Sequence, residues 1–297
     1  MAFPDGATLR VTSLDKVFFP EPGFTKGDLM RYYARIAPLL LPAIAERPLA
    51  LRRFPNGVDG ASFYQQNAGA KVPEGVRTAE VVDAKGQREP RFVGGDLQTL
   101  LYTVQLGCIE VHPWFSILDS LDDPDHAILD LDPGVGVEFA DVVSVARLVK
   151  LELDGAGIAA AIKTSGSRGI HIAIPLPSGI GFADASAVTR EIARRVVEAA
   201  PEHATLERRI RSRPHGTVYL DHQQNARGKT LAAPWAVRAR PGATVSMPLR
   251  WSALRATLDP ARFTLSTVPS RAATTRALWL GILQKRSANA RLRALLD

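Results

Sequence analysis

Ala127-Ile-Leu-Asp-Leu-Asp-Pro133 places Asp130 and Asp132 within an apolar run, and Asp221 ends a similar run, Val218-Tyr-Leu-Asp221. Side chains alternate between the two faces of a strand with a rise of about 3.3 Å per residue, so residues two apart share a face about 6.6 Å apart. The first run therefore predicts a strand that presents both aspartates on one face and turns its leucines toward a core.

Carboxylates held this close repel each other unless cations lie between them. Oxygen ligands suit Mg²⁺ or Mn²⁺, and two such ions about 3.5–4 Å apart are the usual apparatus of nucleotidyl transfer. The three aspartates thus favour a site for two divalent ions. A strand that runs into a turn, with aspartates that merely cap it, is the simpler interpretation.

The bulk properties are those of an ordinary globular protein: 297 residues, of which 46% are hydrophobic and 23% charged. No run approaches 18 apolar residues and the first residues lack the pattern of a signal peptide, so neither a membrane span nor a leader is expected. The single cysteine, Cys108, permits no internal disulfide. We expect a cytoplasmic, nucleoid-associated monomer, since no heptad pattern demands a dimer.

Charge is distributed unevenly along the chain. The segment from Phe115 to Asp141 has eight acidic residues and no Lys or Arg, whereas the segment from Arg208 to Arg240 has eight basic residues and one acid, Asp221. A basic surface suggests a phosphate-rich partner, although a solvated basic face is the plainer alternative. Carboxylates for metal beside guanidinium groups for phosphate favour a nucleoside triphosphate site.

Strand and helix patterns alternate along the chain, which indicates an α/β fold. The predicted helices are Lys26 to about Glu46 with Thr25 as cap, Leu97–Leu106, Glu138–Asp154 closed by Gly155 and Gly157, Asp184 as cap to about Ala200, and Arg276–Leu296. The predicted strands are Thr8–Val11, a short segment from Pro48, Ile109–His112, Leu129–Leu131, Ala159–Lys163, Ile170–Pro175, and a hairpin of Thr217–Leu220 with Thr230–Pro234; residues 66–95 are expected to be irregular with short strands.

Two further segments could contact phosphates. In Thr164-Ser-Gly-Ser-Arg-Gly-Ile-His171 the glycines allow close backbone approach, and Ser165 and Ser167 add hydroxyl groups before His171. The spacing is not that of a P-loop, and an ordinary hairpin turn is the alternative. Lys229 lies in the segment after Asp221, where cations would offset the charge of a triphosphate as pyrophosphate leaves.

The N-terminal part offers candidates for DNA contact. Lys16 and Lys26 lie beside turns and form a plausible phosphate clamp. Phe63 and Tyr64 are adjacent, so one strand cannot bury both in a core and one is available to stack on a base. His112 shares a predicted strand face with a tryptophan, and such a histidine is more often structural than a ligand.

Eight of these segments, taken in order, resemble the polymerase domain of bacterial ligase D, a branch of the archaeo-eukaryotic primase superfamily that acts in non-homologous end joining. They are Leu14-Asp-Lys-Val-Phe-Phe-Pro20, Thr25-Lys-Gly-Asp-Leu29, Arg47-Pro-Leu49, Pro55-Asn-Gly-Val58, Ile109-Glu-Val-His-Pro-Trp114, Leu129-Asp-Leu-Asp-Pro133, Thr164-Ser-Gly-Ser-Arg-Gly-Ile-His171 and Asn225-Ala-Arg-Gly-Lys-Thr230. The resemblance implies one primase-polymerase domain over residues 1–297. Its core of β-sheets flanked by helices would cover about 111–260, with an α/β subregion that binds the DNA end at about 1–110 and a helical segment at 261–297.

The resemblance also implies roles for individual residues. Asp130, Asp132 and Asp221 would be catalytic and hold two ions, with manganese favoured over magnesium. Lys16 and Lys26 would grip the 5′-phosphate at a gap or break, and Phe63 and Tyr64 would stack on the duplex end. The residues assigned to the incoming NTP or dNTP are Ser165, Ser167, His171, Lys229, Arg238, Arg53 and His112.

The implied activity is addition of nucleotides, with ribonucleotides preferred, to a 3′-hydroxyl at gaps or double-strand breaks, beside Ku and a DNA ligase. The family often has asparagine at Ser13, lysine near Gln66 and a basic residue near Gln224, and this chain departs at all three positions. Two alternatives use the same residues: a metal-dependent nuclease, and a catalytically silent module that binds DNA ends.

Overall fold

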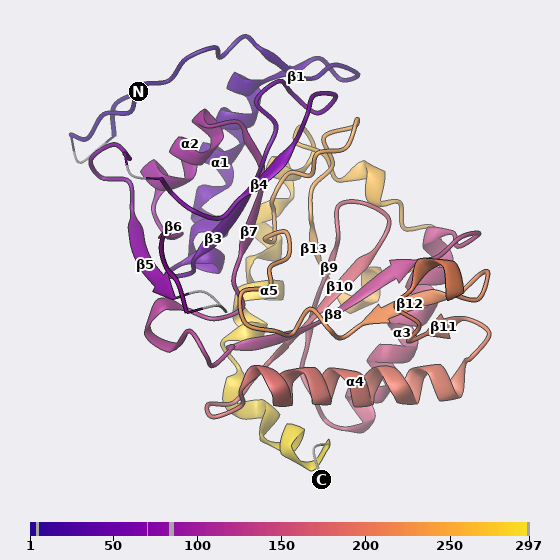
Figure 1. Ribbon diagram of the computed structural model, residues 1–297. Coiled ribbons are helices and arrows are strands. Elements are labelled where there is room, and N and C mark those ends of the chain that lie inside the picture. The colour runs from indigo at the N-terminus through magenta and orange to yellow at the C-terminus, as the bar shows by residue number, and fades with distance from the viewer. Residues whose placement is uncertain (4–5, 70, 83–85, 296–297) are drawn as a thin grey trace. The chain divides into compact units, whose positions relative to one another are not determined.

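A computed structural model describes the chain except residues 4–5, 70, 83–85 and 296–297. It has the mixed α/β architecture that the alternation of patterns predicts (Figure 1). Contacts between Cα atoms divide the chain into two compact units. Unit 1 consists of Met1–Leu118, Thr230–Ser246 and Ala261–Ala273; unit 2 consists of Asp119–Lys229, Met247–Pro260 and Thr274–Asp297. No helix in the described part of the chain is long and apolar enough to cross a membrane.

Unit 1 contains a three-stranded antiparallel sheet, two hairpins and two helices. The sheet has the order β4 (Phe63–Gln65), β3 (Leu49–Arg53), β7 (Cys108–Pro113). The hairpins pair β1 (Val17–Phe19) with β2 (Phe24–Thr25), and β5 (Thr78–Val82) with β6 (Arg88–Phe92). The helices are α1 (Lys26–Ile44) and α2 (Leu97–Gln105), which pack on each other.

Helix α1 begins as its sequence predicts. The Thr25 hydroxyl accepts a hydrogen bond from Asp28 N, and the Asp28 carboxylate accepts one from Thr25 N, which completes a capping box. Apolar residues at helical spacing, among them Leu29, Tyr33 and Leu40, are buried. The predicted strand Thr8–Val11 is wrong: within the described residues this segment forms an isolated bridge from Thr8 to Ala2 and backbone hydrogen bonds between Leu9 and Met1, too short a pairing to count as a strand.

Unit 2 is built on a six-stranded sheet. Its order is β11 (Ala204–Thr205), β12 (Val218–Asp221), β8 (His126–Pro133), β10 (Ile170–Pro175), β9 (Ala161–Thr164), β13 (Pro248–Leu249). Every pairing is antiparallel except that of β11 with β12. Helices α3 (Phe139–Gly155) and α4 (Phe182–Ala199) lie against β8, and α5 (Arg276–Leu283) lies against β9, β10 and β13 (Figure 1).

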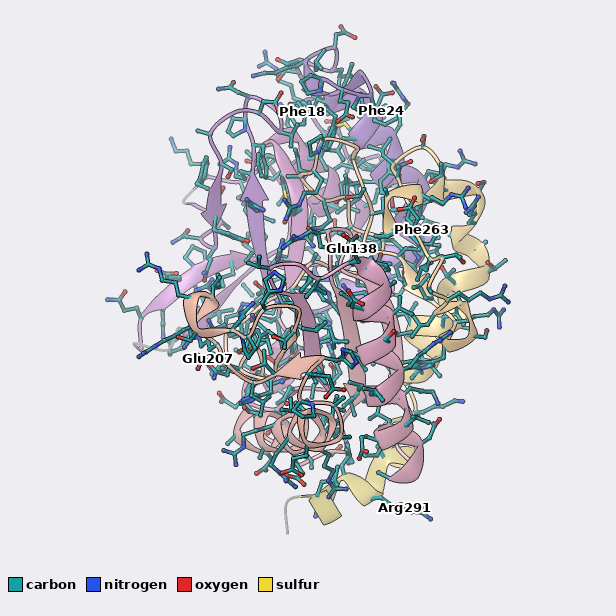
Figure 2. The ribbon with its side chains drawn as sticks, turned by 90° about the vertical axis from the view of Figure 1, so that its right-hand side faces the viewer. Phe18, Phe24, Glu138, Glu207, Phe263 and Arg291 are labelled. Carbon is teal, nitrogen blue, oxygen red and sulfur yellow. The ribbon has the colours of Figure 1, made fainter. Side chains whose placement is uncertain are left out.

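Helix α3 has well-defined ends. Figure 2 shows Glu138 at its first turn, where Glu138 and Asp141 form a capping box. At the other end Gly157 has φ +68°, its N–H donates to Asp154 O, and the next N–H, of Ile158, donates to Leu153 O. These two bonds form the Schellman motif expected where glycine ends a helix.

Two other predicted elements, and then the last predicted helix, need correction. Helix α4 is capped by Gly181, and Asp184 lies inside its first turn. Thr230 bridges Trp114 and does not form a hairpin with β12.

The last predicted helix, Arg276–Leu296, is interrupted. Helix α5 ends at Leu283 and a 3₁₀ segment covers Arg286–Leu295, with non-helical dihedrals at Asn289. The Asn289 amide bonds the backbone N–H and C=O of Ala159 and the C=O of Pro175, and this tertiary contact competes with a continuous helix. The predicted end at Leu296 lies outside the described residues.

Candidate active site

The register of unit 2 gathers the three aspartates on one face of its sheet. Asp221 on β12 lies directly opposite Asp130 on β8, and Asp132 lies opposite Tyr219. Directly opposed residues of antiparallel strands project from the same face, and so do residues two apart on one strand. The leucines between the aspartates are fully buried on the other face. The sheet thus assembles the carboxylates that the sequence pattern singled out.

The aspartates interact with one another and with nearby cations. Burial raises the pKa of Asp132, and Asp221 adds to the rise, whereas Arg213 and Arg168 oppose it. Arg213 Nη1 lies 3.9 Å from Asp132 Oδ2, and its guanidinium lies 4.2 Å from the centre of the Tyr219 ring. The environment of Asp132 therefore favours an additional positive charge at this face.

Asp221 is bonded on both carboxylate oxygens. Tyr219 Oη (3.2 Å) and Gln223 N (2.8 Å) donate to Oδ1, and Gln224 Nε2 (2.9 Å) donates to Oδ2. Burial, together with the nearby Asp221 carboxylate, raises the pKa of Tyr219 to about 12. Gln224 stands near the position where the family often has a basic residue. Its neutral amide bonds Asp221 but does not neutralise the charge of that carboxylate.

The chemical type of the three donors, though not their grouping in the structure, suits a hard divalent cation. All three groups are carboxylates, the ligand type that Mg²⁺ and Mn²⁺ prefer, and they share one face. Within the described residues, no three His, Cys, Asp or Glu side chains are grouped so that they could hold a metal ion. The fit therefore rests on donor chemistry and strand register.

His171 extends the row of polar residues on this face. It lies opposite Asp130 on one side and Lys163 of β9 on the other. Its Nε2 is 3.4 Å from Asp130 Oδ1, and its Nδ1 is 2.6 Å from Lys163 Nζ. Lys163 was not among the predicted site residues, because its pairing with His171 depends on the register of β9 with β10.

The glycine-rich turn between β9 and β10 is organised by Ser165. Its hydroxyl oxygen accepts hydrogen bonds from Ser167 N (3.1 Å) and Gly169 N (3.0 Å), so these two N–H groups have a partner in the turn. A Cβ at position 169 would lie 2.4 Å from Leu131 O, so the close approach to β8 requires glycine.

The segment after Asp221 is anchored by Asn225. This buried amide accepts from Ile128 N (2.7 Å) and donates to Ile128 O (2.7 Å), which ties the loop to β8. Lys229 is exposed, and Arg227 pairs with Asp122 at 2.6 Å. The loop thus combines a buried anchor with an exposed cation.

Unit 1 has a charge cluster centred on Glu110 of β7, whose side chain is 1% exposed. Its carboxylate accepts from Ala239 N (2.9 Å) and interacts with His112 Nε2 (3.0 Å), Arg52 Nη1 (3.3 Å) and Arg238 Nε (3.3 Å). Burial alone would raise the pKa of Glu110, but His112, Arg238 and the Ala239 N–H hold it well below its usual range. Sequence reasoning missed Glu110, although it shares the strand face of His112.

The aromatic pair of β4 faces solvent. Phe63 is 47% exposed and Tyr64 58% exposed. The Arg53 guanidinium lies 5.0 Å from the centre of the Phe63 ring, and Arg52 lies 5.8 Å from that of Tyr64, which also meets His112 edge-on. Arg53 itself bonds Leu106 O and Gln65 Oε1, both at 2.7 Å. Two exposed rings beside guanidinium groups are suited to stacking.

The two predicted clamp lysines differ in environment. Lys16 is exposed, and its Nζ bonds Pro55 O and Asn56 Oδ1, each at 2.7 Å. Lys26 is 5% exposed and bonds Thr12 O and Gln105 Oε1, each at 2.9 Å. Burial lowers the pKa of Lys26, and the charge of Lys16 lowers it further. Lys26 thus anchors the N-terminal segment in this structure.

The structure also shows the surroundings of the other two departures from the family pattern. Ser13 has φ +55°, a left-handed conformation that asparagine adopts more readily than serine. Gln66 Oε1 accepts from the buried Arg91 at 2.5 Å.

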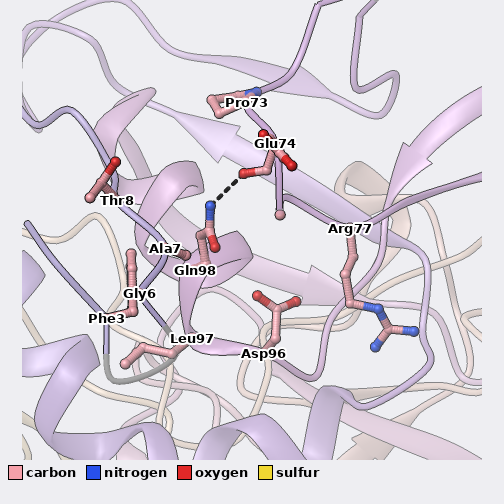
Figure 3. A pocket seen from close by; sticks show the side chains of 11 residues that line it. Phe3, Gly6, Ala7, Thr8, Pro73, Glu74, Arg77, Asp96, Leu97 and Gln98 are labelled. Carbon is pink, nitrogen blue, oxygen red and sulfur yellow. Dashed lines mark hydrogen bonds between the residues drawn. The ribbon is translucent and has the colours of Figure 1, made fainter.

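A cavity of about 860 Å³ in unit 1 involves none of the predicted site residues. Figure 3 shows Asp96, Arg77 and Gln98 around it, with Gln98 Nε2 bonded to Glu74 O at 2.6 Å. The cavity therefore adds no group to the candidate active site.

Comparison with known proteins finds one family model and several relatives. A family model described as LigD, primase-polymerase domain, matches residues 25–279. The bifunctional non-homologous end joining protein LigD of Bacillus subtilis is 35% identical over 264 residues, which cover 89% of this chain and 42% of that protein. The multifunctional LigD of Mycobacterium tuberculosis H37Rv is 33% identical over 269 residues, which cover 87% of this chain and 34% of that protein.

A solved structure agrees with these matches. The polymerase domain of Mycobacterium tuberculosis ligase D in complex with DNA superposes with a TM-score of 0.86 and 29% sequence identity, and the match covers 94% of this chain and 99% of that one. The chain spans less than half the length of the two LigD proteins described above.

Proposed function

This chain belongs to the family of the LigD primase-polymerase domain, and from that premise we propose that it is a nucleotidyltransferase of DNA repair. It adds nucleotides, ribonucleotides in preference, to the 3′-hydroxyl of DNA at gaps or broken ends in non-homologous end joining. The observation that carries the proposal is the strand register that places Asp221 opposite Asp130, with Asp132 on the same face. DNA in the solved relative supports a DNA substrate.

In this proposal Asp130, Asp132 and Asp221 hold two divalent ions, Mn²⁺ or Mg²⁺. When bound, such ions activate the 3′-hydroxyl and stabilise the leaving pyrophosphate. Asp221, whose Oδ2 accepts a hydrogen bond from the Gln224 amide, would be one of the carboxylates that hold an ion. No separate general base is required.

The remaining residues bind and orient the nucleotide and the DNA. His171, Ser165 and Ser167 contact the triphosphate, and the Ser165 hydroxyl also bonds the backbone of its own turn. Arg53, His112, Arg238 and Lys229 complete the nucleotide contacts and offset its charge. Lys16, assisted by Lys26, binds the 5′-phosphate beyond the gap, and Phe63 and Tyr64 stack on the duplex end. Ku and a DNA ligase act on the same break.

The test is extension of a labelled primer on gapped DNA that has a 5′-phosphate, with ribo- or deoxynucleotides and with Mn²⁺ or Mg²⁺. We expect Mn²⁺-dependent addition of a ribonucleotide by the wild type. Asp130→Ala/Asp132→Ala should reduce extension by at least about 100-fold, since metal ligands supply several kcal/mol to the transition state. DNA binding should persist.

Asp123→Ala is the matched control, because Asp123 is an exposed carboxylate of the same acidic segment. Full extension by Asp130→Ala/Asp132→Ala would disprove the metal assignment. DNA binding without extension under every condition would identify a silent end-binding module, and shortening of the primer would identify a nuclease.

A further inference from the structure

A row of four polar side chains crosses the sheet of unit 2. The direct partners are Asp221 with Asp130, Asp130 with His171, and His171 with Lys163. Three of these residues belong to the proposed site, and Lys163 lies at the end of the row with no role assigned to it. Its position beside His171 raises the question of what it contributes.

Lys163 is buried to an extent that is rare for lysine. Only 2% of the residue is exposed, and its Nζ lies 5.6 Å from the centre of the Trp279 ring on α5. Burying an ammonium group is costly unless polar or aromatic partners compensate for lost water. Trp279 is itself buried, so it holds the ammonium over its ring face and confines it near His171.

The donors and acceptors around His171 indicate which imidazole nitrogen carries hydrogen. Lys163 Nζ has hydrogens to donate and lies 2.6 Å from His171 Nδ1, so Nδ1 is the acceptor of that bond. Nε2 faces the acceptor Asp130 Oδ1 at 3.4 Å, which suits an N–H group. Both neighbours therefore select the same tautomer.

We propose that Lys163 is a positioning residue that donates to Nδ1 of His171 and thereby holds the ring with its hydrogen on Nε2, directed along the sheet toward Asp130. The role of this N–H group rests on the proposed function. The oxygens of a nucleoside triphosphate accept hydrogen bonds, and the fixed N–H of His171 offers them an oriented donor. Lys163 acts through the imidazole and does not touch the nucleotide.

The first test reads the tautomer directly, without any reaction. Nitrogen-15 NMR of histidine-labelled protein reports which ring nitrogen carries hydrogen, and His171→Gln identifies the signal among the six histidines. We expect hydrogen on Nε2 in the wild type and in Lys163→Arg, which keeps a donor. In Lys163→Met, which removes it, the His171 signals should shift.

Lys150→Met is the matched control, because Lys150 of the same unit also lies near a tryptophan ring, 5.5 Å from Trp251, but pairs with Asp154. It should leave the His171 signals unchanged. A wild-type spectrum with hydrogen on Nδ1 would overturn the proposal even if Lys163→Met failed to fold. Identical His171 signals in wild type and folded Lys163→Met would do the same.

The second test separates positioning from a general loss of structure. Loss of one oriented hydrogen bond predicts a KM for the nucleotide about tenfold higher in Lys163→Met, with kcat within about threefold of wild type. In the His171→Gln background the same substitution should add less than about twofold, because both residues act through one contact. Additive effects would refute action through His171. If the wild type shows the expected tautomer but extends no primer, the proposed function fails and the positioning of His171 stands.

Discussion

At the scale of single residues, Glu110 is the most consequential side chain that the sequence patterns did not single out. Its carboxylate interacts with Arg238, Arg52 and His112, two of which are proposed to bind the nucleotide. We predict that Glu110→Gln lowers the free energy of unfolding at pH 7 by about 3–5 kcal/mol, the range for breaking a buried charge pair. Urea unfolding followed by circular dichroism measures the difference.

The effect of Glu110 should depend on pH in a defined direction. Its pKa in the folded protein lies well below the value of about 4.3 for an unfolded chain. Its stabilisation is therefore complete above that unfolded value and is lost as the pH falls below it toward the folded pKa. The gap between wild type and Glu110→Gln should shrink below about pH 4. Glu80→Gln, at an exposed position of the same unit, should change stability by less than about 0.5 kcal/mol at either pH.

Period-two alternation was enough to predict that Asp130 and Asp132 share a strand face. It could not predict that Asp221 lies opposite Asp130, because the register between strands far apart in the sequence depends on tertiary packing. Lys163 and Glu110 escaped prediction for a related reason. In a sequence, a buried charged residue cannot be distinguished from an ordinary surface residue until its partners are known.

At the scale of secondary-structure elements, α4 begins with a weak cap. Gly181 is the N-cap with φ −81°, no side chain bonds the first turn, and a Cβ there would have no atom within 4 Å. Asp184 lies three residues later, so Gly181→Ser would create a capping box like that of α1. We predict a gain of about 0.5–1 kcal/mol in unfolding free energy, from the cap and the reduced entropy of the unfolded chain. Differential scanning calorimetry would show a higher Tm.

Gly179 supplies the control for this substitution. It lies two residues earlier but has φ +79°, a left-handed conformation that costs a serine about 1–2 kcal/mol. Gly179→Ser should therefore lower the Tm while Gly181→Ser raises it. Equal effects would show that the cap geometry is not the cause.

Helices with strong local signals could be predicted nearly to the residue, as Thr25 with Asp28 and Gly157 show. Prediction was less successful where local chemistry was ambiguous or a distant contact intervened. Asp184 is of a residue type that often caps helices, but it lies in the first turn of α4. Asn289 interrupts a helical pattern because its side chain bonds backbone groups of Ala159 and Pro175. The glycine-rich turn was located correctly, but the bonds of Ser165 to its N–H groups became visible only in three dimensions.

At the scale of the whole molecule, the net charge of +7 at pH 7 favours binding to a polyanion. Under the proposed function, the logarithm of the DNA association constant should fall linearly with the logarithm of salt concentration, with a slope of about −0.9 for each phosphate contacted. Arg208 and Arg209 are exposed within the basic segment and form no ion pair with an acidic group in the described part of the chain. Arg208→Ala/Arg209→Ala should therefore make the slope shallower by up to about 1.8.

Arg194→Ala/Arg195→Ala removes the same formal charge from the same unit and is the matched control. Both of these arginines pair with Glu191 on α4, so their charge is balanced locally and offers little to a phosphate. Fluorescence anisotropy of labelled gapped DNA at several salt concentrations gives both slopes. If the two double variants shift the slope equally, only net charge matters and the basic segment has no special part in DNA binding. If only Arg208→Ala/Arg209→Ala shifts it, this segment contacts the phosphates.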